Sequence, residues 1–298
     1  MEIVFDIYKS YFMKHLKIFI NLTRLSKPIG FLLLFWPCAW GLAYAYNTNQ
    51  NTNLFFYYLV LFFFGSVLMR SAGCIFNDIV DKDIDSQVRR TKQRPIASGK
   101  ISVEKALIYV LILCGLAFLI LIQFNFTTIV LGLSSMILAF SYPFMKRITY
   151  WPQLFLGITF NWGIIMAWTA INNNINLEIF ILYFSAIFWT LGYDTIYGAQ
   201  DMSDDEIIGL KSTSIKFKNN IGLFVSISYL TTVVLMTYLF RSFVGFNIFT
   251  IFFIMFIFTL IYQVKEIKKN KFKNYLRLFK LNNFSGLFLF TGIYSINL

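Results

Sequence analysis

Long apolar runs follow one another along almost the whole of this 298-residue chain, and they constrain its fold more than any other feature. Hydrophobic residues make up 58% of the sequence and charged residues only 13%, whereas about a quarter of the residues of a soluble globular domain are charged. A run of about 20 apolar residues is long enough to cross a bilayer as an α-helix. The sequence therefore predicts an all-α integral membrane protein.

Polar and basic loops divide these runs into about nine transmembrane helices around a central polar cavity open to the cytoplasm. We expect the helices at residues 28–46, 54–76, 104–123, 126–145, 153–171, 178–199, 221–240, 246–264 and 281–298. Residues 1–27 are interpreted as an amphipathic lead along the cytoplasmic surface, against the headgroups of membrane lipid. Residues 28–298 then form a single transmembrane domain.

Basic residues are distributed unevenly between the two sides of this arrangement. The loops after the even-numbered helices are rich in Lys and Arg, while those after the odd-numbered helices hold one basic residue, Arg241. The positive-inside rule places the N-terminus and the even-numbered exits in the cytoplasm. The net charge of +12 is thereby attributed to topology, and we expect no binding of nucleic acid. No targeting presequence is recognisable, which favours a bacterial inner membrane over a mitochondrial one.

An acidic stretch stands at the end of the second apolar run, from Asn77 to Asp85. On a continuous helix, Asn77, Asp81 and Asp85 fall at i, i+4 and i+8, with Asp78 beside them and Asp83 pointing away. Carboxylates on one face repel each other. Mg²⁺ would remove that repulsion, because it binds carboxylates and commonly bridges them to a substrate's phosphates. The stretch predicts a magnesium–diphosphate site.

A second acidic stretch ends the sixth apolar run, at the matching place in the other half of the chain. Asp194, Asp201 and Asp205 fall at i, i+7 and i+11, again on one helical face. Nine of the 14 acidic residues lie in these two stretches. Solvation alone does not explain such a concentration.

Cations that suit a diphosphate follow each acidic stretch. Arg binds phosphate through two donors and Lys acts as a point charge. The candidates are Arg90, Arg94, Lys146, Arg147 and Lys211, with Ser212 beside the last. The alternative for each is an ordinary positive-inside residue.

Two charged residues lie inside apolar runs, Arg70 in the second and Asp194 in the sixth. Burying a charge in hydrocarbon costs at least about 2.5 to 3.5 kcal/mol, so each should face a polar cavity or an ionic partner. Arg70 stands seven residues before Asn77 and near the same face. It either lines the cavity, where it would meet an anionic co-substrate, or forms a structural ion pair between helices.

The two acidic stretches resemble the signatures of the UbiA superfamily of intramembrane prenyltransferases. The family's first signature is matched in this chain by Asn77-Asp78-x-x-Asp81-x-x-x-Asp85, Arg90-Thr91-x-x-Arg94-Pro95 and Ser98-Gly99. The segment that follows this signature in the family is similar to Tyr142-Pro143, Lys146-Arg147 and Pro152-Gln153 of this chain. The second signature, most similar to that of the 4-hydroxybenzoate polyprenyltransferases of ubiquinone synthesis, is carried by Tyr193-Asp194-Thr195-Ile196-Tyr197, Gln200-Asp201-x-x-Asp204-Asp205 and Gly209-x-Lys211-Ser212-Thr213.

The resemblance implies a prenyltransferase domain at 28–298 that transfers a polyprenyl group from polyprenyl diphosphate to the ring of 4-hydroxybenzoate, meta to its carboxylate. It implies Mg²⁺ as cofactor, which we assign to Asp81, Asp85, Asp201 and Asp205. The diphosphate is assigned to Asn77, Arg90, Arg94, Lys146, Arg147, Lys211 and Ser212. Catalysis is assigned to Asp78, Asp194 and Arg70. The chain departs from the family pattern at Met202-Ser203, where relatives often have a charged residue. This departure does not change any of the assigned ligands.

Two alternatives remain open at this point. Another member of the superfamily would prenylate haem, a naphthoate, homogentisate or a chlorin. A cation transporter would also place acidic residues inside a membrane, although transport does not require the Arg-Pro and Lys-Ser-Thr segments beside them.

Overall fold

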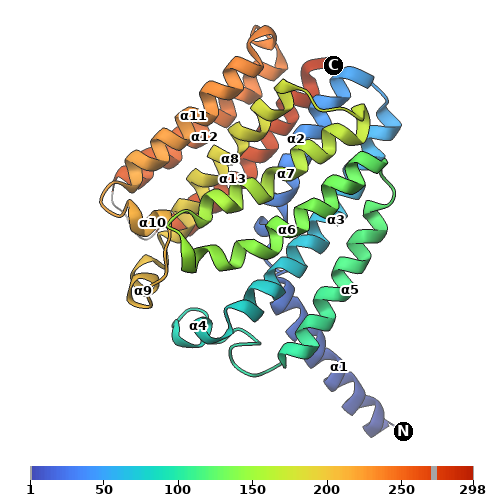
Figure 1. Cartoon of the computed structure of the whole chain (residues 1–298), viewed down its shortest axis with the longest axis vertical. Helices are drawn as coiled ribbons and strands as arrows, with labels where there is room; N and C mark the ends of the chain where they lie inside the picture. The colour runs from blue at the N-terminus through green and yellow to red at the C-terminus, as the bar shows by residue number, and fades with distance from the viewer. Residues whose placement is uncertain (1, 270–273, 298) are drawn as a thin grey trace.

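The computed structural model describes residues 2–269 and 274–297, and the side chains of 13–269 and 274–296. Helices account for all regular structure in these ranges, which contain no strand (Figure 1). The elements are α1 Glu2–Thr23, α2 Ile29–Asn49, α3 Thr52–Val80, α4 Lys82–Gln87, α5 Val103–Leu121, α6 Phe126–Ile148, α7 Pro152–Asn172, α8 Leu177–Gly198, α9 Met202–Ile207, α10 Thr213–Lys216, α11 Ile221–Leu239, η1 Arg241–Phe243, α12 Ile248–Lys268, α13 Tyr275–Tyr294 and η3 Ser295–Asn297.

Side-chain caps explain why most long helices begin close to their predicted starts. An Asn or Ser side chain accepts a hydrogen bond from the backbone N–H three residues on, which satisfies one of the free donors of a first turn. This cap occurs at Asn51, Ser102, Asn125, Asn176 and Asn247. α7 begins at Pro152, whose missing N–H is not needed in the first turn.

Eight of the described helices, α2, α3, α5, α6, α7, α8, α11 and α12, are long and apolar enough to cross a membrane. The predicted all-α integral membrane fold is therefore confirmed. α13 is of similar length but less apolar, so the ninth crossing stays a prediction. α13 also begins six residues earlier than expected. Its first two turns bury Leu278 and Phe279 and expose Arg277 and Lys280, and this amphipathic pattern resembled a basic loop in the sequence.

The centre of the bundle is formed by α2, which packs against α3, α7 and α13. Trp40 of α2 lies 4.8 Å from the ring of Trp189 on α8, and its indole N–H donates to the Gly286 carbonyl of α13 at 2.9 Å. Gly41 permits the close approach to α7, because a Cβ there would lie 2.5 Å from the Ile164 carbonyl oxygen. Small residues at such crossings are typical of membrane helices.

A buried polar cluster joins the second half of the bundle. Asn282 of α13 accepts from Trp189 Nε1 of α8 at 3.0 Å and donates to Gln263 Oε1 of α12 at 3.0 Å. Tyr229 of α11 donates to the same Gln263 oxygen at 2.7 Å. These bonds satisfy polar groups that would be costly to leave unpaired in an apolar interior, and they set the relative positions of four helices.

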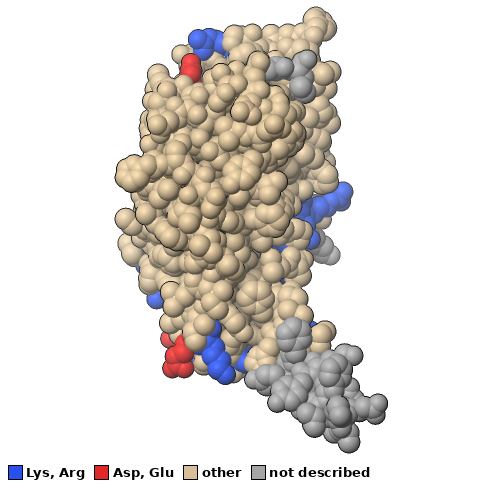
Figure 2. All heavy atoms as spheres, turned by 90° about the vertical axis from the view of Figure 1, so that its right-hand side faces the viewer, with Lys and Arg blue, Asp and Glu red and all other residues tan. Residues whose placement is uncertain are grey.

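The two ends of the bundle differ in character. The short helices α4, α9 and α10 and the N-terminal α1 gather at one end, whereas the C-terminus lies at the other (Figure 1). This matches the predicted placement of the N-terminus and the even-numbered exits on one side. One long face of the bundle is almost free of charged side chains, which lie at its margins (Figure 2). An uncharged face of this kind suits contact with lipid.

Candidate functional site

Two helix junctions with matching backbone geometry organise the site. Asp81 stands between α3 and the six-residue α4, with φ −95° and ψ 7°. Asp201 stands just before the six-residue α9, with φ −107° and ψ 3°. The expectation of one continuous helix from Asn77 to Asp85 is therefore wrong, because α3 ends at Val80. The four-residue hydrogen-bond spacing nevertheless continues through Asp81, so Asp85 still lies on the buried side and Asp83 on the exposed side.

Asp81 is fully buried and accepts hydrogen bonds from three side chains. Asn77 Nδ2 donates to Oδ2 at 3.0 Å, and Lys146 Nζ binds the same oxygen. Arg147 Nη2 lies 3.4 Å from Oδ1 and donates to the Val80 carbonyl at 2.7 Å. The last turn of α6 thus supplies both cations that neutralise this carboxylate.

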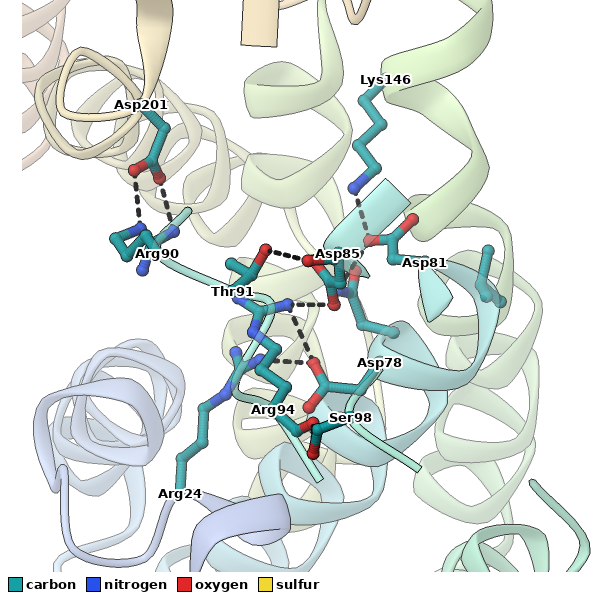
Figure 3. Close-up of polar contacts among 12 residues, drawn as sticks. Arg24, Asp78, Asp81, Asp85, Arg90, Thr91, Arg94, Ser98, Lys146 and Asp201 are labelled. Atoms are coloured by element: carbon teal, nitrogen blue, oxygen red, sulfur yellow. Dashed lines mark hydrogen bonds and ion pairs between the residues drawn. The ribbon is translucent and has the colours of Figure 1, made fainter. Parts of the chain in front are cut away.

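Asp78 and Asp85 are joined by Arg94, from which dashed lines run to both carboxylates in Figure 3. Arg94 Nη1 donates to Asp78 Oδ1 at 3.0 Å and to Asp85 Oδ2 at 2.7 Å. Asp78 Oδ1 also accepts from Arg24 Nη2 at 2.5 Å. Both carboxylates are buried, so each depends on these guanidinium groups for its negative charge to be compensated.

The second acidic stretch is tied to the first by Arg90. Its Nε and Nη2 donate to the two oxygens of Asp201 at 2.6 and 2.5 Å, which is a bidentate geometry. Asp205 lies one turn further along α9. The pKa of Asp205 is raised to about 6, mainly by burial and also by the neighbouring Asp201, against the opposing effect of Lys146 and Arg90.

A cavity of about 1490 Å³ connects these groups. Its walls come mainly from α2, α3, α5, α6 and α7, with α8 also contributing, and most of the predicted site residues line it. Those residues are Arg70, Asn77, Asp78, Asp81, Asp85, Arg90, Arg94, Lys146, Asp194, Asp201, Asp205, Lys211 and Ser212. Arg147 is not among the lining residues, although it contacts Asp81. The structure thus brings together nearly all of the residues that the two motifs suggested.

Lys211 and Ser212 already have partners at the cavity edge. Lys211 donates from Nζ to the Ile148 carbonyl at 3.2 Å and from its backbone N–H to the Lys146 carbonyl at 2.8 Å. Ser212 Oγ caps α10 by accepting from the Ile215 N–H at 3.2 Å. The Ser212 hydroxyl retains its proton for a further bond.

Arg70 and Asp194 line the cavity farther along α3 and α8. Arg70 forms no ion pair with a carboxylate of the described residues, which argues against its reading as an interhelical ion pair. Its guanidinium lies 5.3 Å from the centre of the Phe160 ring, and its buried Nε has no hydrogen-bond partner. An anionic group in the cavity would supply that partner.

Arg24 is the cation that sequence reasoning missed. It precedes Asp78 by 54 residues and stands among the basic residues of the N-terminal segment, where nothing in its spacing separates it from Lys27. No signal in the chain connects Arg24 with the acidic stretch, because their contact depends on how α1 packs.

Comparison with known proteins identifies the family of this chain. The UbiA prenyltransferase family matches residues 34–285. The chain belongs to this family. The curated 4-hydroxybenzoate polyprenyltransferase, mitochondrial, of Drosophila pseudoobscura pseudoobscura is 46% identical over 211 residues, which are 70% of this chain and 53% of the relative. The chain thus spans about half the length of this UbiA family relative.

Solved structures of UbiA homologs share the fold. The apo structure of a homolog from Aeropyrum pernix K1 has a TM-score of 0.75 at 22% identity, and covers 88% of this chain and 96% of the homolog. A homolog from Archaeoglobus fulgidus bound to GPP and Mg²⁺ has a TM-score of 0.68 at 18% identity, with 94% and 100% covered. At these identities the likeness concerns the UbiA fold alone.

Proposed function

We propose that this UbiA family member is a Mg²⁺-dependent 4-hydroxybenzoate polyprenyltransferase, and that it joins a polyprenyl group to the ring carbon meta to the carboxylate. The observation that carries the proposal is that two acidic helix junctions and the cations paired with them, which include Arg90, Arg94 and Lys146, meet at one large cavity between membrane helices. The 46% identity to a relative of that name supports the choice of acceptor. The proposal includes a bacterial inner membrane, with the site facing the cytoplasm.

Mg²⁺ suits the donor set on chemical grounds. The residues that would hold it, Asp81, Asp85, Asp201 and Asp205, offer the oxygen ligands that this hard cation prefers. No group of three His, Cys, Asp or Glu residues in the described chain is arranged to hold a metal by itself. That agrees with the usual binding of Mg²⁺ through one or two carboxylates plus substrate phosphates and water. When bound, Mg²⁺ would supply positive charge where the leaving diphosphate becomes more negative.

The cations of the site are placed to bind the diphosphate. Arg90, Arg94 and Lys146 line the cavity and now neutralise Asp201, Asp85 and Asp81. If metal takes over those carboxylates, the same cations become available to phosphate oxygens, where they stabilise the leaving group. Asn77, Lys211 and Ser212 are further candidates for phosphate contact. Arg147, which does not line the cavity, supports Asp81 from outside.

The deeper part of the cavity suits the aromatic acceptor. The guanidinium of Arg70 forms no ion pair with a carboxylate of the described residues, and its buried Nε would bind the carboxylate of 4-hydroxybenzoate. Asp194 also lacks an ion pair within the described residues. It is the acid best able to accept the proton that the ring carbon releases after alkylation. The apolar helices around the site exclude water that would otherwise react with an allylic cation.

Membranes from cells that express the chain provide the direct test. They are incubated with labelled 4-hydroxybenzoate, a polyprenyl diphosphate and Mg²⁺, and lipid is then extracted. We expect label in the lipid phase, and its loss when a chelator is added. Label carried only by another acceptor, such as a naphthoate or homogentisate, would change the substrate but not the reaction type. Cation uptake into vesicles without consumption of diphosphate would contradict the enzymatic function.

A further inference from the structure

The carboxylate of Asp78 is unusual in this site because two guanidinium groups share it. Arg24 Nη2 and Arg94 Nη1 both donate to Oδ1, at 2.5 and 3.0 Å. The side chain of Asp78 is 2% exposed. Asp85, in contrast, has Arg94 as its only ion-pair partner among the described side chains. Arg94 is therefore required by Asp85 but is a second partner for Asp78.

Arg24 reaches Asp78 from a backbone that is held in place. The last turn of α1 buries Leu22 completely, and Leu22 belongs to the same apolar cluster as Ala72 and Ile75 of α3. Ile75 lies one turn before Asp78, so α1 is anchored on the helix that carries the carboxylate. Arg24 itself has φ 55°, in the left-handed region that non-glycine residues seldom adopt. This conformation ends α1 and places the Arg24 side chain at the cavity.

The two arginines differ in their attachment. Arg94 lies in the loop that follows α4, and its guanidinium contacts acids of both α3 and α4. If the proposed function holds, Arg94 must leave at least Asp85 when diphosphate and metal bind. Asp78 would then be a buried carboxylate that has lost a cation, which is strongly unfavourable unless another cation remains.

We propose that Arg24 is a positioning residue that stays paired with Asp78 and thereby lets Arg94 exchange its carboxylate partners for the diphosphate. The inference rests on the proposed function and adds a residue outside both acidic motifs to the site. It assigns Asp78 the role of a permanently paired carboxylate that orients the end of α3, rather than the catalytic role expected from the sequence. It also connects the N-terminal helix to substrate binding.

A double-mutant cycle tests this role. Equilibrium binding of a radiolabelled polyprenyl diphosphate, with Mg²⁺ and without aromatic acceptor, is measured on the purified full chain for wild type, Arg24→Gln, Asp78→Asn and the double variant. We expect Arg24→Gln to weaken binding at least about tenfold in the wild-type background, because Asp78 is left without a permanent cation. In the Asp78→Asn background the same change should cost less than about twofold, because there is no charge left to compensate.

Two further variants separate charge from geometry. Arg24→Lys keeps a point charge near Asp78 and should bind within about threefold of wild type. Lys17→Gln removes one exposed charge from the same α1 helix and should leave binding unchanged, which excludes a general effect of charge at the membrane surface. If Arg24→Gln alone does not fold, recovery of folding in the double variant gives the same support.

The outcomes that overturn the inference are distinct. Equal weakening by Arg24→Gln in both backgrounds would mean that Arg24 binds diphosphate directly or only anchors α1. No weakening at all, or loss of folding in both backgrounds, would also reject it. If the wild-type chain binds no polyprenyl diphosphate, the proposed function itself fails, whereas an additive cycle in a chain that binds rejects the role of Arg24 alone.

Discussion

Arg90 binds both carboxylate oxygens of Asp201, through Nε at 2.6 Å and Nη2 at 2.5 Å. The two residues are 111 positions apart in the chain, and their pairing joins the loop after the first acidic stretch to the middle of the second. The Arg90 side chain is 48% exposed, so this ion pair stabilises the fold only modestly. Its main consequence is to hold a cation with two phosphate-compatible donors at the cavity.

Replacement of Arg90 should therefore affect substrate binding more than folding. We expect Arg90→Ala to raise the KM for polyprenyl diphosphate at least about tenfold, which corresponds to about 1.4 kcal/mol. The exposed neighbour Arg89 does not line the cavity, so Arg89→Ala is the matched control and should leave KM unchanged. A similar rise in both variants would show that the loop, and not the Arg90 guanidinium, is responsible.

Removal of either junction aspartate should abolish most activity. We expect Asp81→Ala and Asp201→Ala each to lower kcat at least about a hundredfold, because each loses a carboxylate that the proposed metal requires. Transfer of labelled 4-hydroxybenzoate into lipid measures this. Asp83→Ala is the control, since Asp83 is exposed on the opposite side of α4. Full activity of both junction variants would contradict the proposal that both acidic stretches bind the metal.

Acid should weaken metal binding through Asp205. Burial raises the pKa of this carboxyl to about 6 from its ordinary value of 3.8. Below pH 6 the folded metal-free protein therefore holds a proton on Asp205 that Mg²⁺ has to displace. We expect the Mg²⁺ concentration for half-maximal binding of polyprenyl diphosphate to rise about tenfold per pH unit below pH 6.

The control for this pH dependence is Asp205→Asn, which carries no proton to displace. Its Mg²⁺ requirement should be higher at neutral pH and should change little between pH 7 and pH 5. An unchanged slope in Asp205→Asn would assign the titration to another group.

Helix packing at Gly41 is open to a stability test. A Cβ at Gly41 would lie 2.5 Å from the Ile164 carbonyl oxygen, and that backbone cannot move aside without separating α2 from α7. We expect Gly41→Ala to lower the free energy of unfolding by about 1 to 3 kcal/mol. Unfolding in detergent, followed by circular dichroism, measures the change.

Gly65 on α3 is the matched control, since a Cβ there meets no atom within 4 Å. Gly65→Ala should be neutral or stabilising by up to about 1 kcal/mol, because alanine is the better helix former. Equal destabilisation of the two variants would mean that the α2–α7 contact is not the cause.

The sequence by itself determined the class of fold and most members of the site. Apolar runs of helical length leave few alternatives to a bundle of membrane helices. The Lys and Arg residues of the loops indicated which helix ends lie on the same side of the membrane. The carboxylates were found because both clusters are local, with spacings of four or seven residues that any helix places on one face. Arg90, Arg94 and Lys146 were found for a similar reason, since each stands close to one of the family's motifs.

Tertiary structure decided which charges meet. A spacing of four residues could not reveal that α3 breaks at Asp81, because the hydrogen-bond pattern continues across the junction. The pairing of Arg90 with Asp201 depends on α4 and α9 lying at the same end of the bundle. The contact between Arg24 and Asp78 depends on Leu22 packing against α3. Such long-range contacts are set by the packing of whole helices, whereas local spacing reports only on neighbours within one helix.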